Sequence, residues 1–174
     1  EGHNFYNAFP SISSNENLMA YADDTRGRRI YTIRFKNLIT GQQFPETISN
    51  TSGNMVWAED NQTLFYAKRD PETLRSFQIY RHAMGTDPGK DVLIFEEEDE
   101  EFSSRVWKTK SKEYIVISSS HTMMDEHRFV DAASPTNSFQ LFIKRSRGHE
   151  HRIDHIGDHF YVLTNLGSAK NFQI

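Results

Sequence analysis

A repeat of about fifty residues constrains the fold of this chain more than any other feature of its sequence. Trp57 and Trp107 are each followed, seven residues later, by the start of a short apolar segment. Two weaker copies of the pattern are anchored by Ile12 and Ile153, so that successive anchors lie 45, 50 and 46 residues apart. A period of about 40 to 50 residues is typical of the blades of a β-propeller. The repeat therefore predicts a propeller-like arrangement of small sheets.

Each copy contains the same succession of elements: an anchor strand, a polar turn, an apolar strand and then two further strands. Near-continuous apolar runs predict second strands that are buried on both faces, at 18–22, 64–67, 114–117 and 160–163. Alternating or short apolar segments predict the third strands at 29–35, 76–82 and 127–132 and the fourth strands at 44–48, 91–96 and 139–143. Almost no helix is expected, because no window shows a capped apolar stripe with helical spacing.

These elements predict an all-β fold of four-stranded antiparallel blades. The expected blade boundaries are 7–49, 54–96, 103–143 and 149–174, with the last blade truncated inside its third strand. We therefore expect residues 1–174 to be a fragment of a partial β-propeller, about three and a half blades long. A two-sheet sandwich is the structural alternative, and the regular period favours blades over it.

Composition excludes several classes of protein. A net charge of −4 provides no basic stripe for nucleic acid, and no apolar run approaches the roughly 20 residues of a membrane helix. The chain contains no cysteine, which excludes disulfides and fits a reducing, cytoplasmic compartment. It begins with glutamate and carries no recognisable signal peptide.

A histidine-rich segment is a candidate metal site. His149 and His151 could share one strand face, His155 and His159 follow, and Asp154 could add an oxygen ligand. The alternative is a histidine-rich surface strand and turn, with His159 beginning a buried strand. We expect no metal and no cofactor, because the spacing lacks the tight pairing of zinc ligands.

Charged clusters give two further candidates. The acidic run 96–101 could bind calcium or attract a basic substrate, but no glycine-punctuated calcium loop surrounds it, and a solvated linker between blades is expected. Two basic spots could bind a phosphate or a carboxylate, although solvated arginines beside turns are the expected reading. These spots consist of Arg26, Arg28 and Arg29, and of Lys144, Arg145 and Arg147.

The chain contains no recognisable catalytic machinery. No serine has glycine at both −2 and +2, so the nucleophile elbow of the α/β-hydrolases is absent, and no phosphate loop or dinucleotide fingerprint occurs. Trp57 and Trp107 could stack on a ligand in a central channel. Equivalent, buried positions between adjacent sheets are the expected role for both.

Several segments of the sequence resemble the propeller of the prolyl oligopeptidase family, and together they cover essentially the whole chain. Positions that match the wider family pattern are Ser14, Leu18, Ala20, Asp24, Gly27, Tyr31, Ile33, Leu38, Thr40 and Gly41. Five segments in order resemble the oligopeptidase B, or protease II, branch: RRIYTIRFKNLITG (28–41), VWAEDNQTLFY (56–66), YRHAMGT (80–86), FEEEDEEF (95–102) and residues 149–174. Arg29 departs from the acidic residue of the wider family, although the double arginine fits this branch.

The resemblance implies a seven-bladed propeller and a parent serine peptidase that cuts short peptides after Arg or Lys. Its Ser, Asp and His would lie in a C-terminal α/β-hydrolase domain, so no catalytic role falls on residues 1–174, and the substrate-binding residues are unknown. The implied partners are that peptidase domain and short basic peptides. A freestanding propeller that binds proteins is the alternative function, and a metal-dependent hydrolase propeller is a third, which lacks the required ligands.

Self-association of the chain is also expected. An open arc of blades would leave an apolar face at each end, and monomers rarely expose large apolar patches. A homodimer through the end blades, or through the strand around 171–174, is the simplest outcome.

Overall fold

The computed structural model describes residues 7–167, 169 and 171–174, which form β-strands and one short 3-10 turn. The first group of strands is β1 (Asn7–Ile12), β2 (Leu18–Asp24), β3 (Tyr31–Asn37), β4 (Gln43–Trp57), β5 (Thr63–Arg69), β6 (Ser76–Ala83) and β7 (Val92–Glu96), with the turn η1 (Pro88–Lys90) before β7. The second group is β8 (Ser103–Lys108), β9 (Tyr114–His121), β10 (Met124–Asp131) and β11 (Gln140–Ile143), followed by β12 (His151–Ile156) and β13 (His159–Thr164). The predicted all-β class is confirmed, and no described helix is long and apolar enough to cross a membrane.

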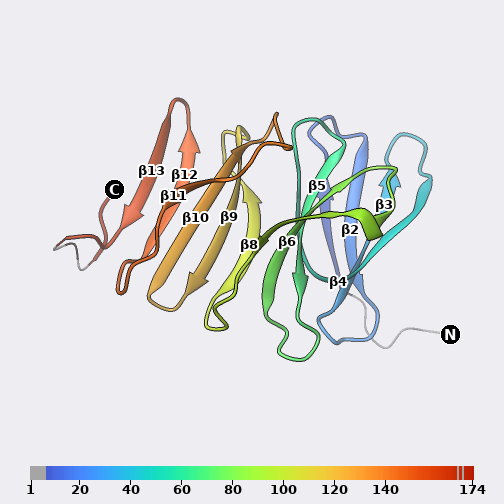
Figure 1. The fold of residues 1–174 in the computed structure, drawn as a ribbon. Helices are drawn as coiled ribbons and strands as arrows, with labels where there is room; N and C mark the ends of the chain where they lie inside the picture. The colour runs from blue at the N-terminus through green and yellow to red at the C-terminus, as the bar shows by residue number, and fades with distance from the viewer. Residues whose placement is uncertain (1–6, 168, 170) are drawn as a thin grey trace.

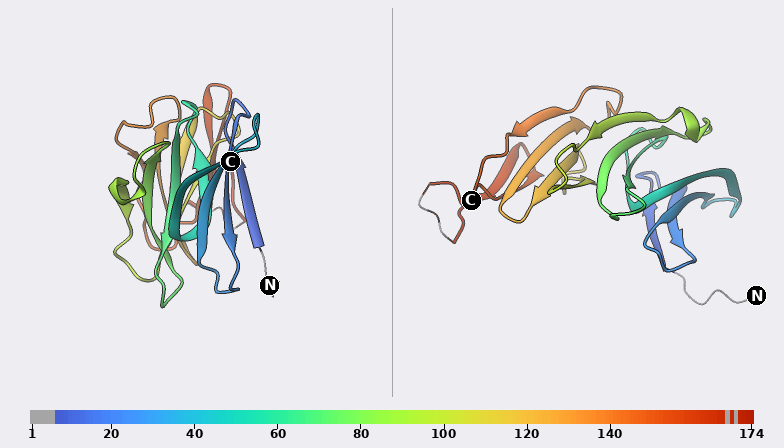
Figure 2. Two further views of the ribbon diagram at one scale, coloured as in Figure 1. Left: turned by 90° about the vertical axis from the view of Figure 1, so that its right-hand side faces the viewer. Right: turned by 60° about the horizontal axis from the view of Figure 1, so that its bottom comes forward.

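The strands form three antiparallel sheets that follow one another along the chain. Strands β1 to β7 pair in sequence order, β8 to β11 form a four-stranded sheet, and β12 pairs with β13 (Figure 1). Seen from below, the sheets are stacked along an arc, with the N-terminal strands at one end and the β12–β13 hairpin at the other (Figure 2). Within each sheet every strand thus pairs with its neighbours in sequence, which is the meander expected of propeller blades.

Strand β4 differs from the predicted pattern because it joins two repeats. The sequence predicts a short strand at 44–48 and a separate anchor strand near Trp57, whereas the structure has one continuous strand of 15 residues. Its first part pairs with β3 and its last part with β5, with a register irregularity between Thr51 and Met55. Gly53 lies in this bend with a φ of +83°, and a Cβ there would approach Phe9 to 3.0 Å. Only glycine fits both the dihedral angle and the close contact.

The middle strands are buried on both faces, as predicted from their apolar runs. In β5, Leu64 and Tyr66 pack against β2 and β3, whereas Phe65 and Ala67 face the four-stranded sheet. We name the second contact the apolar interface; its buried members are Ala58, Phe65, Ala67, Ile79, Val106, Ile115, Ile117, Val130 and Ala132. No titratable side chain belongs to this set.

The outermost sheets do not follow the same prediction. Strand β13 was expected to be buried on both faces, yet Tyr161 is 48% and Leu163 36% exposed. His159, expected to begin a buried strand, is itself exposed. In β2 the buried residues are Ala20, Ala22 and Asp24, which share one face, while Leu18, Met19 and Tyr21 are partly exposed. Both outcomes have one physical cause: these strands have a described sheet packed against only one of their faces.

Candidate binding pocket

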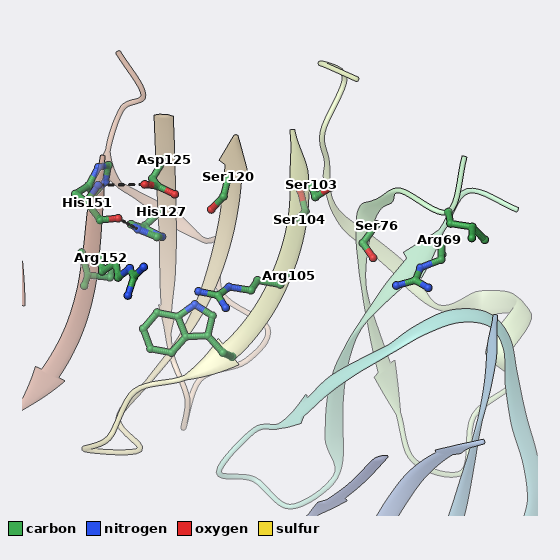
Figure 3. A pocket seen from close by; sticks show the side chains of 13 residues that line it. Arg69, Ser76, Ser103, Ser104, Arg105, Ser120, Asp125, His127, His151 and Arg152 are labelled. Carbon is green, nitrogen blue, oxygen red and sulfur yellow. Dashed lines mark hydrogen bonds between the residues drawn. The ribbon is translucent and has the colours of Figure 1, made fainter. Parts of the chain in front are cut away.

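A pocket of about 970 Å³ opens where the four-stranded sheet meets the β12 strand. Its walls come from β8, β9, β10 and β12, and its far side from the connection between β5 and β6. Arg105 on β8 and Arg152 on β12 extend into the space between these two strands, and Arg69 approaches from β5 (Figure 3). The pocket is therefore formed by segments that are up to 84 positions apart in the chain.

A chain of hydrogen bonds fixes the inner wall of the pocket. The indole N–H of Trp107 donates to Ser118 Oγ at 2.8 Å, and Ser118 Oγ lies 2.9 Å from Nδ1 of His127. On its other side, His127 Nε2 lies 3.1 Å from the carbonyl oxygen of His151 and donates to it. Burial lowers the pKa of His127, and the hydrogen bond to the carbonyl only partly opposes this. A neutral His127 with its proton on Nε2 satisfies every link of the chain.

His151 lies between two other imidazoles and is 1% exposed. Its ring stacks on His149 at 4.6 Å and meets His127 edge-on at 4.8 Å. Burial, together with the neighbouring His127 and His149, lowers the pKa of His151 to about 4, so the ring is neutral at pH 7. Neither ring nitrogen has a hydrogen-bond partner among the described residues, and the same holds for the buried Oγ of Ser104 and the buried Nε of Arg69 in this pocket. Unpaired buried polar groups are rare and costly, so their clustering in one pocket requires an explanation.

The charge of the pocket is positive. Arg69, Arg105 and Arg152 line it, and none of them forms an ion pair with any residue that the structure describes. The single carboxylate among the lining residues is Asp125, which accepts the backbone N–H of His151 at 3.1 Å. Since the histidines here are neutral, the arginines set the electrostatic character of the pocket.

Comparison with known proteins places the chain in a family. The model of the prolyl oligopeptidase N-terminal β-propeller domain matches residues 5–174. The chain belongs to this propeller family.

Two curated relatives and one solved structure indicate which members of the family it resembles. Dipeptidyl aminopeptidase BI of Pseudoxanthomonas mexicana is 43% identical over 174 residues, which are 99% of this chain and 24% of that protein. Protease 2 of Moraxella lacunata is 33% identical over 165 residues, 94% of this chain and 24% of that protein. Oligopeptidase B from Leishmania major superposes with a TM-score of 0.92 at 29% identity, covering 98% of this chain and 24% of that one. The chain thus spans about a quarter of the length of these relatives.

The structure separates the histidines that the sequence groups into one candidate metal site. His149 and His151 do lie together, but His155 Nδ1 lies 2.9 Å from Ser111 Oγ, and its ring packs on Tyr114. Asp154 accepts the backbone N–H of Lys110 at 2.9 Å. In the described part of the chain no three His, Asp or Glu side chains are arranged to hold a metal ion.

The prediction that the acidic run 96–101 is a solvated linker is wrong for Glu97. Glu97 is 2% exposed and binds Arg145 through two hydrogen bonds of 2.9 and 3.1 Å, while Ser119 also donates to it. Burial alone would raise the pKa of Glu97, but the hydrogen bonds from Arg145, Ser119 and the Asp99 N–H lower it overall. Arg145 therefore does bind a carboxylate, but one within the chain. Its guanidinium also lies 4.1 Å from the ring centre of Phe102.

The other basic spot stays near a turn, as expected. Asp24 accepts the backbone N–H groups of Arg26, Gly27 and Arg29 and thereby shapes this turn. The side chain of Arg28 is exposed. This spot does not contribute to the pocket.

The predicted equivalence of Trp57 and Trp107 is also wrong. Trp57 faces Leu64 across its hairpin, whereas Lys108, not Trp107, faces the matching Ile115 in the next hairpin. A shift of one residue turns a side chain to the other face of its sheet. Trp57 is accordingly 1% exposed within the core, while Trp107 is partly exposed and lines the pocket.

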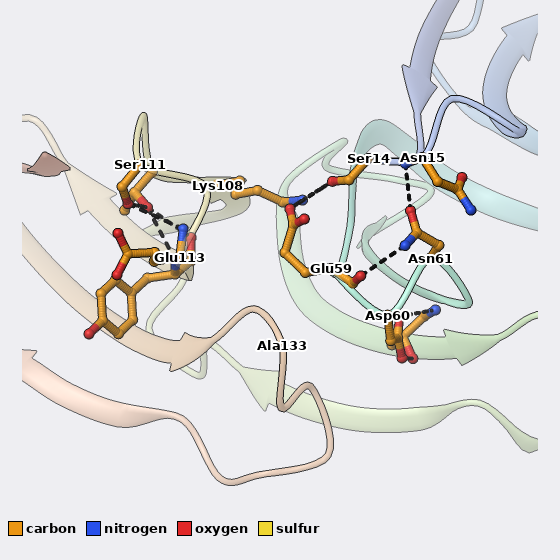
Figure 4. Close-up of polar contacts among 12 residues, drawn as sticks. Ser14, Asn15, Glu59, Asp60, Asn61, Lys108, Ser111, Glu113 and Ala133 are labelled. Carbon is orange, nitrogen blue, oxygen red and sulfur yellow. Dashed lines mark hydrogen bonds and ion pairs between the residues drawn. The ribbon is translucent and has the colours of Figure 1, made fainter. Parts of the chain in front are cut away.

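Lys108, at the position equivalent to Trp57, makes a polar contact instead. Its Nζ lies 2.5 Å from Glu59 Oε1, and Ser14 Oγ donates to the same oxygen at 2.7 Å (Figure 4). The backbone N–H of Asn15 donates to Asn61 at 2.8 Å. These contacts join the first hairpins of three successive repeats, β1–β2, β4–β5 and β8–β9, at one end of the strands.

Sequence reasoning missed the residues that make the pocket specific. His127 lies in a predicted strand but has no predicted role, and Ser118 lies just beyond the strand predicted at 114–117, whereas β9 continues to His121. The alternation of polar and apolar residues indicates which residues share a face only once the strand bounds are known. A second buried polar group was missed as well: His82 Nδ1 lies 2.7 Å from Asp91, which also accepts from the Tyr66 hydroxyl at 2.9 Å. This group lies in the seven-stranded sheet and outside the pocket.

Proposed function

We propose that residues 1–174 form part of the propeller of a serine oligopeptidase that cleaves short peptides after Arg or Lys. The observation that carries the proposal is the agreement over essentially the whole chain with the propeller of oligopeptidase B. The division into blades at 7–49, 54–96, 103–143 and 149–174 is part of this proposal. The peptidase chemistry would come from an α/β-hydrolase domain outside these residues, in a cytoplasmic protein.

The propeller would act by steric selection. A ring of blades over an active site admits short, flexible peptides and excludes folded proteins, and it also shields the reaction from water. The chain carries no G-x-S-x-G segment, which agrees with a role in access and not in bond cleavage.

Cleavage by the whole protein tests this function. We expect the full-length gene product to hydrolyse short peptides after Arg or Lys, and to be blocked by a serine-directed inhibitor. Residues 1–174 alone are the control and should give no turnover. Equal cleavage after uncharged residues would contradict the specificity, and inhibitor-sensitive turnover by the control would contradict the assignment of the chemistry.

Release of dipeptides is a second candidate activity. It is favoured by the 43% identity to a protein named Dipeptidyl aminopeptidase BI. The two activities differ in whether the substrate needs a free amino terminus. Comparing one peptide with free and with acetylated amino termini decides between them: loss of cleavage on acetylation supports the dipeptidyl activity.

We also propose that residues 1–174, when isolated, associate with themselves through the end sheets. Phe9 and Ile12 are 46% and 54% exposed at one end of the arc, and Tyr161, Leu163 and Leu166 are 48%, 36% and 58% exposed at the other. Contiguous apolar surface of this kind favours association. Light scattering during gel filtration should give a dimer or a larger species, and a monomer at high micromolar concentration would contradict this.

A further inference from the structure

We propose that the pocket between β8 and β12 binds the carboxylate group of a peptide. The proposal deepens the function given above, because it assumes that the ligand is a peptide. It assigns to the propeller wall a recognition role in addition to steric selection.

The first argument comes from the arginines. Arg105 and Arg152 extend from facing strands into one space, and Arg69 lies on the far side of the same pocket (Figure 3). None of the three is paired with a carboxylate among the described residues. A planar guanidinium binds a carboxylate through two parallel hydrogen bonds, and this geometry is the strongest that arginine offers. Elsewhere in this chain Arg145 holds Glu97 in that way.

The second argument is independent of charge. Ser104 Oγ and both ring nitrogens of His151 are buried without a partner, although these residues line the pocket. Leaving such groups unpaired is energetically costly, because they lose their hydrogen bonds to water without gaining others. A ligand with hydrogen-bonding oxygens and N–H groups could satisfy them after a small side-chain rotation. Buried polar groups of this kind cluster where a protein recognises polar ligands.

The third argument concerns the rest of the ligand. The indole of Trp107 is partly exposed in the pocket, and Leu74 and Ile153 add apolar surface. An aromatic wall beside a charged anchor suits a peptide better than a small inorganic anion. The volume of about 970 Å³ is large enough for several peptide residues.

The positive charge also explains which end of a substrate would lie here. A basic side chain would be repelled by three arginines that have no carboxylate partner among the described residues, whereas a carboxylate would be attracted. The carboxylate can belong to the carboxyl terminus of a short peptide or to an acidic side chain, and the chemistry of recognition is the same for both.

The binding test uses residues 1–174 labelled with nitrogen-15 and follows the two indole N–H signals. Trp107 lines the pocket, while Trp57 donates to Ser11 O at 3.0 Å in a different core and serves as the internal reference. The probes are acetyl-tetra-alanine with a free carboxyl terminus, its carboxy-terminal amide, and acetyl-Ala-Glu-Ala-Ala-amide. We expect a saturable shift of the Trp107 signal with a carboxylate-bearing probe, and binding of the plain amide weaker by about tenfold or more.

The probes and variants also define how the proposal fails. A shift with the free acid alone assigns a carboxyl terminus, and a shift with the glutamate peptide assigns a side chain. Arg105→Gln and Arg152→Gln should each weaken binding about three- to tenfold, whereas the exposed Arg28→Gln should leave it unchanged. Equal binding of acid and amide, no saturable shift, tighter binding of inorganic phosphate than of either acidic probe, or unaltered binding in both variants would overturn the proposal.

Measurements of enzyme kinetics test the carboxylate site separately from the proposed peptidase function. In the full-length gene product, Arg105→Gln and Arg152→Gln should raise KM for peptides with a free carboxylate but not for the matching amides, with kcat unchanged. Cleavage with no such difference between acid and amide would overturn the carboxylate site and leave the peptidase function intact. Absence of any cleavage, with the indole shift retained, would overturn the function and leave the site.

Discussion

The two faces of strand β9 belong to interfaces of opposite chemical character. On one face, Ile115 and Ile117 join the apolar interface. On the other, Ser118 belongs to what we name the histidine interface, the contact of the four-stranded sheet with β12 and β13. Its rings are those of His127, His151, His155, Tyr114, Phe129 and Phe160. The apolar interface has no group that changes charge, whereas the histidine interface has three imidazoles beside a pocket.

This difference shows how one repeat can serve two purposes. Alternation along a strand places neighbouring residues on opposite faces, so stability and recognition can be assigned to adjacent positions of one sequence. The apolar face holds the sheets together, and the polar face provides groups that a ligand or a proton can reach. The predictions below test whether the apolar and the polar contacts between the sheets differ in energy as they do in composition.

The largest expected difference is between the two tryptophans. Trp57→Ala should lower the free energy of unfolding by about 3–5 kcal/mol, because a fully buried aromatic side chain is removed from a core. Trp107→Ala should cost about 1–2 kcal/mol, because this side chain is partly exposed and loses mainly one hydrogen bond to Ser118. Urea unfolding of both variants measures the difference. Equal losses of unfolding free energy in the two variants would mean that Trp57 and Trp107 do occupy equivalent positions, as the sequence suggests.

The next largest effect concerns the ion pair between Glu97, which follows β7, and Arg145, which follows β11. Glu97→Gln should lower the free energy of unfolding at pH 7 by about 2–3 kcal/mol, because it leaves Arg145 without its carboxylate in a partly buried place. The exposed Glu98→Gln, in the same acidic run, is the matched control and should change stability by less than about 0.5 kcal/mol. Similar values for both variants would mean that the whole run is solvated.

The same pair predicts a dependence on pH. The pKa of Glu97 is lowered in the folded protein, so the ionised form contributes stability above the unfolded pKa of about 4.5. That contribution disappears as the pH falls through the lower pKa of the folded state. Melting curves from pH 6 to pH 3 should therefore converge for Glu97→Gln and the unchanged protein, and curves that stay parallel would contradict the assignment.

The smallest effect is expected in the histidine interface. The pKa of His151 falls to about 4 in the folded state, whereas the unfolded residue takes up a proton near pH 6.5, so acidification through this window favours unfolding. His151→Phe keeps a ring between His127 and His149 but cannot titrate. Relative to the unchanged protein, it should gain about 2 kcal/mol between pH 7 and pH 4.5. A stability difference that stays constant over this range would show that His151 titrates normally.

The sequence predicted the repeat well because strands that are buried on both faces consist almost entirely of apolar residues. The run from Leu64 to Ala67 is apolar at every position, and the structure buries all of it. Turn residues and alternation likewise located the third strands of the first three repeats, and the fourth strands of the second and third, to within a few residues. These signals are local, so a single sequence is sufficient to read them.

The pairing register and the long-range partners could not be read in this way. Trp107 looks equivalent to Trp57 by counting, yet the hydrogen bonds of its hairpin place Lys108 at that position. Glu97 is indistinguishable in sequence from its acidic neighbours until Arg145, 48 positions away, is brought beside it. The pocket depends on contacts of the same kind, which is why the sequence revealed none of its arrangement.

Strand β4 determines which parts of the molecule should unfold together. Because this strand pairs with β3 over its first part and with β5 over its last part, hydrogen bonds connect β1 to β7 without a break. Protection of backbone amides against exchange with solvent deuterium should therefore be lost across these seven strands together, as one cooperative unit. The connection from β7 to β8 has no such shared strand, and the two sheets are joined there by side-chain contacts and by the backbone hydrogen bond from the Glu59 N–H to the Ala132 carbonyl oxygen. The boundary between independently opening parts thus falls between the second and third repeats and not between the first and second.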